Sequence, residues 1–252
     1  MTRICLETLD GFPLVEPGDD LVELICRSLE AGGQVLEDGC VLVLAQKIVS
    51  KAEGRYRNLS EIVPGDRAKL LATETAKDPR LVQAILDEST EVVRRRKGVL
   101  IVRHKRGWVM AQAGIDQSNI EGGDEGRILL LPEDPDASAL KLKTELERRS
   151  GVSLGVVIAD SFGRPFRNGT TGIAIGAAGL TSFLDKRGHR DLFGKTLQVS
   201  TIAHADEIAS AASILMGQAD EGTPVVLIRG LSPSAHVDAS SLVRPIEDDM
   251  FR

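Results

Sequence analysis

Aromatic side chains are scarce in this sequence: 1 Trp, 1 Tyr and 6 Phe make up 3% of its 252 residues. A hydrophobic core must therefore consist mainly of aliphatic residues, and the composition argues against nucleic-acid binding by base stacking. Positive charge is also in short supply, because 31 Lys and Arg stand against 37 Asp and Glu and leave a formal net charge of −6. An acidic chain is poorly suited to neutralise phosphate backbones, so we expect no nucleic-acid partner. The one basic cluster, within residues 94–106, is interpreted as a solvated hairpin.

Long hydrophobic runs are missing too. Apolar stretches such as residues 155–159 are far shorter than the roughly 20 residues that span a bilayer. Arg3, Glu7 and Asp10 interrupt the first ten residues, which therefore lack the apolar region of a secretory signal. We expect a cytoplasmic protein with no membrane partner. The three cysteines show no CxxC spacing, which predicts buried thiols rather than a disulfide framework or a zinc site.

Several common catalytic motifs are absent as well. The sequence has no GxxxxGK[ST] and no GxGxxG, so a bound nucleotide would have to be held outside the common phosphate-loop schemes. It has no GxSxG elbow, which argues against a serine hydrolase of that type. The four histidines show neither HxxxH nor HExxH spacing, which argues against a zinc centre.

Short apolar runs and helical periodicities alternate irregularly along the chain. Because two hairpin-like pairs occur and strands do not alternate strictly with helices, we expect an α+β fold with a mixed sheet and hairpins. We expect it to form one domain over residues 1–252, or two subdomains that fold together. The predicted strands are 41–45 (running out into a polar loop), 98–102, 108–112, 127–131, 152–158 and 224–229; the predicted helices lie within 68–93, broken at Pro79, and at 139–150 and 206–216.

Two aspartates directly follow predicted strands. Asp116 comes after residues 108–115 and is followed by Asn119; Asp160 comes after residues 156–159 and is followed by Ser161. Carboxylates in such positions suit a hard divalent cation, which completes its shell with water and phosphate oxygens. Each could instead cap the turn that follows it. The pair of similar positions gives weight to the metal interpretation.

Basic residues that could bind an anion occur in two places. Residues 162–172, read as a long polar loop, contain Arg164, Arg167 and several glycines, and this composition favours binding of a phosphate or carboxylate over a merely solvated loop. Lys47 and Lys51 follow the strand at 41–45 and could reach phosphate oxygens, although a solvated loop lysine is the commoner case.

Seven segments, in order over nearly the whole chain, resemble the coenzyme F420-0:L-glutamate ligase family. SKAEGR and AGID-S-N are the most specific parts. The segments are 12–15 (FPLV), 46–55 (QKIVSKAEGR), 113–119 (AGIDQSN), 130–136 (LLPEDPD), 160–167 (DSFGRPFR), 191–194 (DLFG) and 205–210 (ADEIAS).

The resemblance implies a GTP-dependent ligase that adds L-glutamate, through γ-glutamyl links, to the phospholactate tail of the deazaflavin coenzyme F420-0. GTP would convert the substrate carboxylate to an acyl phosphate, and the amine of glutamate would displace the phosphate. The resemblance further implies two sites for Mg²⁺ or Mn²⁺, a K⁺ requirement and an intertwined homodimer.

Carried over by position, the resemblance also implies roles for individual residues. Asp116 and Asp160 would hold one divalent cation, Ser161 and the position of Gln218 would serve a second, and Lys51 would act in catalysis with the two aspartates. The departure is Gln218, since a glutamate is expected there and an amide is a weaker ligand for a hard cation. The implied GTP contacts are Phe12, Pro13, Leu14, Val15, Gln46, Lys47, Lys51, Asn119, Met216, Gly217, Gln218, Ala219, Asp220, Glu221, Gly222 and Thr223.

A competing interpretation from the residues alone is a metal-dependent phosphatase, or a protein that binds a phosphorylated small molecule. Such a protein would use the same carboxylates and arginines, but it would need neither Lys51 nor the turn at residues 216–223. Nucleotide turnover that requires both glutamate and the deazaflavin distinguishes the two.

Overall fold

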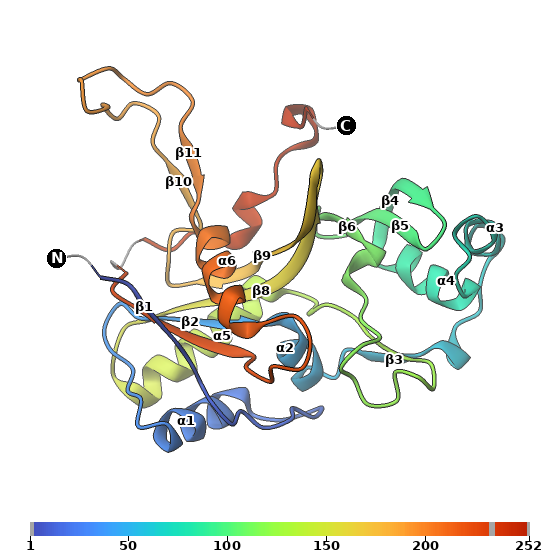
Figure 1. The fold of residues 1–252 in the computed structure, drawn as a ribbon, viewed down its shortest axis with the longest axis horizontal. Coiled ribbons are helices and arrows are strands. Elements are labelled where there is room, and N and C mark those ends of the chain that lie inside the picture. The colour runs from blue at the N-terminus through green and yellow to red at the C-terminus, as the bar shows by residue number, and fades with distance from the viewer. Residues whose placement is uncertain (1–2, 232–234, 251–252) are drawn as a thin grey trace.

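The computed structural model describes residues 3–231 and 235–250 (Figure 1). The ends of the expected domain, residues 1–2 and 251–252, and the segment 232–234 lie outside the described residues. Among the described residues, no helix has the length and apolar character required to cross a membrane.

A five-stranded mixed sheet forms the centre of the fold. Its strands occur in the order β1 (Cys5–Thr8), β12 (Val225–Arg229), β2 (Val41–Ala45), β8 (Gly155–Arg164) and β9 (Arg167–Ala178). Only β2 and β8 are parallel, and the other neighbours in this sheet are antiparallel. The α+β class and the mixed sheet predicted from the sequence are therefore confirmed.

Both faces of this sheet are buried by helices. Leu42 and Leu44 of β2 belong to the core shared with α1 (Leu21–Ala31) and α5 (Pro135–Ser150), whereas Val41 and Val43 face the core shared with α6 (His204–Met216). Figure 1 shows α6 on one side of the sheet and α1 and α5 on the other. Burial on both faces explains why β2 reads as a continuous apolar run and not as an alternating one.

Two glycines of β9 let these helices approach closely. A Cβ atom at Gly176 would overlap the carbonyl oxygen of Pro135 in α5, and one at Gly172 would overlap that of Ala209 in α6. The backbone of β9 thus packs directly on both helices, which fixes the position of β8 and β9 relative to α6.

A second layer of structure lies beside the sheet, at the right of Figure 1. Here α3 (Asp66–Thr75) and α4 (Pro79–Asp87) cover a three-stranded antiparallel sheet of β4 (Ser89–Arg96), β5 (Val99–His104) and β6 (Val109–Ala111). The predicted hairpin and the break at Pro79 are confirmed. The helical expectation was wrong beyond residue 87, where β-branched residues enter β4.

Short elements connect these layers. The pair β3 (Tyr56–Asn58) and β7 (Arg127–Leu129) forms a small antiparallel ribbon. The helix α2 (Gln46–Ala52) starts immediately after β2, so the polar loop predicted there was wrong. The remaining single turns of 3₁₀ helix are η1 (Leu59–Glu61), η2 (Gln112–Gly114), η3 (Ala239–Leu242) and η4 (Ile246–Asp248).

Two hairpins project from the body of the molecule (Figure 1). The outer halves of β8 and β9 remain paired from Asp160↔Ile173 to Arg164↔Arg167, so residues 162–172 form a ribbon and not the loop that the sequence suggested. Polar residues on both faces of this exposed ribbon hide the two-residue period of a strand. The second projection is the arm formed by β10 (Phe183–Asp185), β11 (Thr201–Ala203) and residues 186–200 between them.

Candidate functional site

A cavity of about 1100 Å³ lies where the central sheet meets the β3–β7 ribbon. Its walls come from the segment before α1, the start of α2, β8, the loop that follows η2 and the turn between α6 and β12. All but one of the site residues expected from the sequence line it. They are Phe12, Pro13, Leu14, Val15, Gln46, Lys47, Lys51, Asp116, Asn119, Asp160, Ser161, Met216, Gly217, Gln218, Ala219, Asp220, Glu221 and Gly222.

Thr223 is the exception. Its hydroxyl donates to the carbonyl oxygen of Leu215 at 2.9 Å, so it holds the turn at the end of α6 and does not line the cavity. Phe12 and Val15 line the cavity but are 8% and 5% exposed, because their side chains belong to the hydrophobic core. Leu14, by contrast, is 89% exposed. A ligand can meet this segment mainly through its backbone and the exposed side chains of Pro13 and Leu14.

Asp116 is held in place by both its backbone and its carboxylate. Its backbone exchanges two 2.9 Å hydrogen bonds with Leu129. Its Oδ2 accepts a hydrogen bond from Gln46 Nε2 at 2.8 Å and lies 3.5 Å from Lys47 Nζ. Ser50 donates to Oε1 of Gln46 at 2.9 Å, which orients the Gln46 amide so that its N–H group faces Asp116. The start of α2 therefore positions this carboxylate.

Asp160 lies within β8 and not beyond its end, because the strand continues to Arg164. Its Oδ1 accepts a hydrogen bond from the backbone N–H of Ser161 at 2.8 Å. Burial, and then the negative charge of Asp116, raise the pKa of Asp160 to about 7. Burial also raises the pKa of Asp116, although Lys47 and Gln46 oppose that effect. The carboxylate of Asp116 thus lies close enough to Asp160 to disfavour the charged form of that residue.

Lys51 and Lys47 lie one turn apart on α2 and face the same cavity. Lys47 Nζ donates to the carbonyl oxygen of Ser118 at 3.1 Å. Within the described chain, the Lys51 ammonium has no hydrogen-bond or ion-pair partner; burial and then the charge of Lys47 lower its pKa. An unpaired, partly buried ammonium on a cavity wall is suited to bind an anion.

The loop after η2 and the turn after α6 are joined at the rim. Asn119 donates from Nδ2 to the carbonyl oxygen of Ala219 at 2.8 Å, and Glu221 accepts from the backbone N–H of Ala219 at the same distance. Gln218 lies on this turn with its side chain exposed to the cavity. Asn119 therefore ties the turn that carries Gln218 to the loop that carries Asp116.

The sequence did not single out several polar residues of this wall. Arg127 lies over the ring of Tyr56, with its Cζ atom 3.7 Å from the ring centroid, and both line the cavity with Glu16 and Glu121. Tyr56 is the single tyrosine and directly follows the segment QKIVSKAEGR, a signal that could have marked it. Arg127 carried no local signal, because only the pairing of β3 with β7 brings it to the site.

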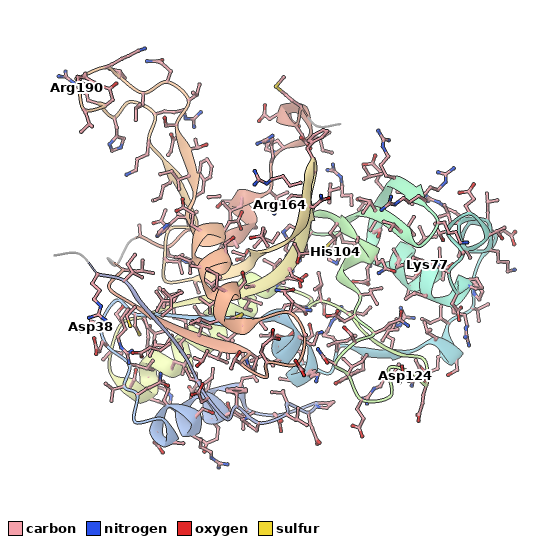
Figure 2. The ribbon with its side chains drawn as sticks, viewed as in Figure 1. Asp38, Lys77, His104, Asp124, Arg164 and Arg190 are labelled. Carbon is pink, nitrogen blue, oxygen red and sulfur yellow. The ribbon has the colours of Figure 1, made fainter. Side chains whose placement is uncertain are left out.

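The arginines of the ribbon do not contribute to this cavity. Arg164 and Arg167 pair with each other at the outer end of β8 and β9, and Figure 2 shows Arg164 on the projecting ribbon. The anion site predicted for residues 162–172 is therefore not built within this chain's cavity. Among the described residues, no group of three or more His, Cys, Asp or Glu side chains is arranged to hold a metal ion, so protein carboxylates alone do not form a closed metal cage.

Comparison with known proteins decides the family. A family model described as F420-0:gamma-glutamyl ligase matches residues 11–230, most of the chain. The chain belongs to this family. The resemblance drawn from the sequence motifs is thereby confirmed.

Curated relatives of this gamma-glutamyl ligase family member match over nearly full length. The chain is 47% identical over 253 residues to a coenzyme F420:L-glutamate ligase from Methanothermobacter thermautotrophicus, covering 99% of both chains. A ligase of the same description from Methanopyrus kandleri is 46% identical over 94% of this chain and 93% of the relative. One from Archaeoglobus fulgidus is 42% identical over 99% of this chain and 97% of the relative.

Proposed function

We propose that this protein is a GTP-dependent ligase that joins L-glutamate to the phospholactate tail of coenzyme F420-0. The observation that carries the proposal is the convergence of nearly all the family-derived site residues on one cavity. Family membership supports the same reaction, because the relatives bear the name coenzyme F420:L-glutamate ligase.

The chemistry must overcome the poor reactivity of a carboxylate toward an amine in water. In the proposed reaction, an oxygen of the acceptor carboxylate attacks the γ-phosphorus of GTP, the bond to the bridging oxygen breaks, and GDP leaves. The amine of glutamate then attacks the acyl phosphate, loses a proton, and displaces inorganic phosphate as the amide bond forms. Catalysis of the first step rests mainly on positioning and on charge stabilisation.

Lys51 and Lys47 are the groups of this chain suited to the transferring phosphate. Lys51 has no partner in the described structure, so its ammonium can bind a phosphate oxygen without first breaking an ion pair. Lys47 is already held by Asp116 and the Ser118 carbonyl group, which fixes its direction. We assign Lys51 to the γ-phosphate and Lys47 to positioning.

Asp116 and Asp160 fit a hard divalent cation, Mg²⁺ or Mn²⁺. Their neighbouring buried carboxylates disfavour each other's charge, and a bound cation would relieve that repulsion. When bound, the cation would neutralise charge on the phosphate oxygens. Ser161 and Gln218, both on the cavity wall, would serve a second cation, and Gln218 supplies a neutral oxygen. A K⁺ requirement stays part of the proposal through the family resemblance alone.

The remaining walls would hold the nucleotide. Residues 12–15 and the turn at 216–222 face the cavity from opposite ends of the chain, and Asn119 is tied to that turn. Backbone groups of such turns can meet phosphate and sugar oxygens without side-chain charge. We propose that Thr223 acts indirectly, by holding the turn.

We also propose an intertwined homodimer. Leu192 and Phe193 of the arm are almost completely exposed, at 99% and 96%. Figure 1 shows that the arm projects from the body of the chain. Large apolar side chains on a projecting arm are typical of a surface that another chain covers.

The proposed mechanism is tested by isotope transfer. With ¹⁸O in the acceptor carboxylate, an acyl phosphate predicts one ¹⁸O atom in the inorganic phosphate released per amide formed. Phosphate without label would refute that route. The alternative, a phosphatase or a binding protein for a phosphorylated ligand, predicts GTP turnover that is independent of glutamate and the deazaflavin, or none.

A further inference from the structure

Arg127 is a cationic residue of the cavity that has no role in the proposed phosphate chemistry. Its guanidinium carbon Cζ lies over the Tyr56 ring, 3.7 Å from the centroid, on the wall of the cavity. No hydrogen bond or ion pair joins its side chain to any other described residue. The ring therefore helps to hold the guanidinium in place, while its N–H groups stay available for a ligand.

The cavity that Arg127 lines also contains two negatively charged side chains. Glu121 and Glu16 line the same cavity, and their side chains make no hydrogen bond or ion pair within the described chain. Burial first, then the negative charges of these two glutamates, raise the pKa of Tyr56, while Arg127 opposes the rise. Both carboxylates therefore act on the ring that carries Arg127.

The loop between Glu121 and Arg127 explains this arrangement. The backbone N–H of Arg127 donates to the carbonyl oxygen of Gly122 at 3.0 Å, so residues 122–127 form a closed turn. Gly122 has φ +74°, a conformation that glycine adopts without strain. The turn thus places Glu121 and Arg127 at its two ends, on one cavity wall.

A planar cation beside carboxylates is poorly suited to a polyanion. Glu121 and Glu16 would repel a triphosphate, and the proposed function already assigns Lys47, Lys51 and the aspartate pair to phosphate and its cation. An α-amino acid carries a carboxylate and an ammonium on the same carbon atom, which matches a guanidinium with a neighbouring carboxylate.

We infer that Arg127 and Glu121 form the subsite for the α-amino-acid end of the incoming L-glutamate, an inference that rests on the proposed function. The guanidinium of Arg127 binds the α-carboxylate, and the carboxylate of Glu121 faces the α-ammonium group. Tyr56 is a positioning residue, because it acts on the substrate only through Arg127. The α-nitrogen, which must lose a proton before it attacks the acyl phosphate, is thereby held beside Glu121 and one carbon atom away from the α-carboxylate that Arg127 binds.

The test is the effect of Arg127→Lys on the KM values of all three substrates. Lysine keeps the charge but loses the planar fork, so the KM for L-glutamate should rise about tenfold while the values for GTP and the deazaflavin stay within about twofold. Tyr56→Leu removes the ring and should also raise the KM for L-glutamate, and Tyr56→Phe, which keeps the ring, should raise it less. The matched control is Arg57→Lys, on the same strand as Tyr56 but paired with Asp87 and outside the cavity.

The outcomes separate this inference from the proposed function. A wild-type protein that forms no amide refutes the function, and the subsite with it. An active wild type whose KM for glutamate is unchanged by Arg127→Lys, or whose KM for GTP rises instead, refutes the subsite alone.

The α-carboxylate assignment is tested with two competitors of L-glutamate. L-Glutamine keeps the α-carboxylate and L-isoglutamine replaces it with an amide, so glutamine should inhibit the wild type at about tenfold lower concentration. Arg127→Lys should remove most of that difference. Equal inhibition, the reverse order, or no inhibition by glutamine would overturn the assignment.

Discussion

Asp160→Asn should stabilise the metal-free protein at alkaline pH, although it removes a residue that we place at the centre of the site. Burial and the charge of Asp116 raise the pKa of Asp160 from its ordinary value of 3.8 to about 7. The folded state therefore holds a proton that the unfolded state has lost between these values, so stability falls as the pH rises through this window.

The size of the effect follows from that difference. About 3 pH units at about 1.36 kcal/mol per unit give a ceiling of about 4 kcal/mol. Because water enters an open cavity and screens the charge, we expect about 2 kcal/mol. The neutral amide escapes this cost, so the variant should match the wild type near pH 4 and exceed it by about 2 kcal/mol at pH 8.

Urea unfolding followed by circular dichroism, at fixed protein concentration with EDTA and at several pH values, measures this difference. Excess Mg²⁺ should then stabilise the wild type more than the variant. The control is Asp124→Asn, on an exposed loop outside the cavity wall (Figure 2). A difference between wild type and Asp160→Asn that does not change with pH would refute the reasoning.

Three further predictions concern the metal ligands and the proposed dimer. Asp116→Asn and Asp160→Asn should each abolish ligation while the circular dichroism spectrum stays native; near-normal turnover at saturating metal would remove them from the metal site. Gln218→Glu should lower the Mg²⁺ or Mn²⁺ concentration for half-maximal activity by up to about tenfold, about 1.4 kcal/mol, because it adds a carboxylate; an unchanged midpoint for both ions contradicts its role. Light scattering at micromolar concentration should give a dimer that Leu192→Ser with Phe193→Ser weakens, and a monomeric wild type would refute the dimer.

The parts of the fold that could be predicted are those in which the pattern of apolar and polar residues, or a proline, marks the element. The strand β2 was placed at its observed bounds, because a five-residue apolar run between polar turns is typical of a short buried strand. Pro79 marked the break between two helices correctly, and in the structure α4 starts there with Asp78 as its N-cap. The ribbon at 162–172 was missed because solvent reaches both of its faces, so no alternation of polar and apolar residues marks it.

The residues of the candidate site also fall into those that the sequence could predict and those that it could not. Residues within recognisable motifs, such as Lys51 and Asp116, could be named from the sequence, and the cavity brings them together. Arg127 could not, since its place depends on the pairing of two three-residue strands that are far apart in the chain. Arg164 and Arg167 are the opposite case, because their composition favoured anion binding but they lie at the outer end of the ribbon and do not line the cavity.

The central claim is tested most directly by mass spectrometry of a single reaction. The purified protein is incubated with GTP, L-glutamate, a divalent cation and coenzyme F420-0, with one component left out in each control. We predict deazaflavin products extended by glutamyl residues, with one GDP formed for each residue added, and no turnover of GTP when either glutamate or the deazaflavin is missing. GTP hydrolysis without glutamylated product, or an unmodified deazaflavin in the complete mixture, would contradict the account.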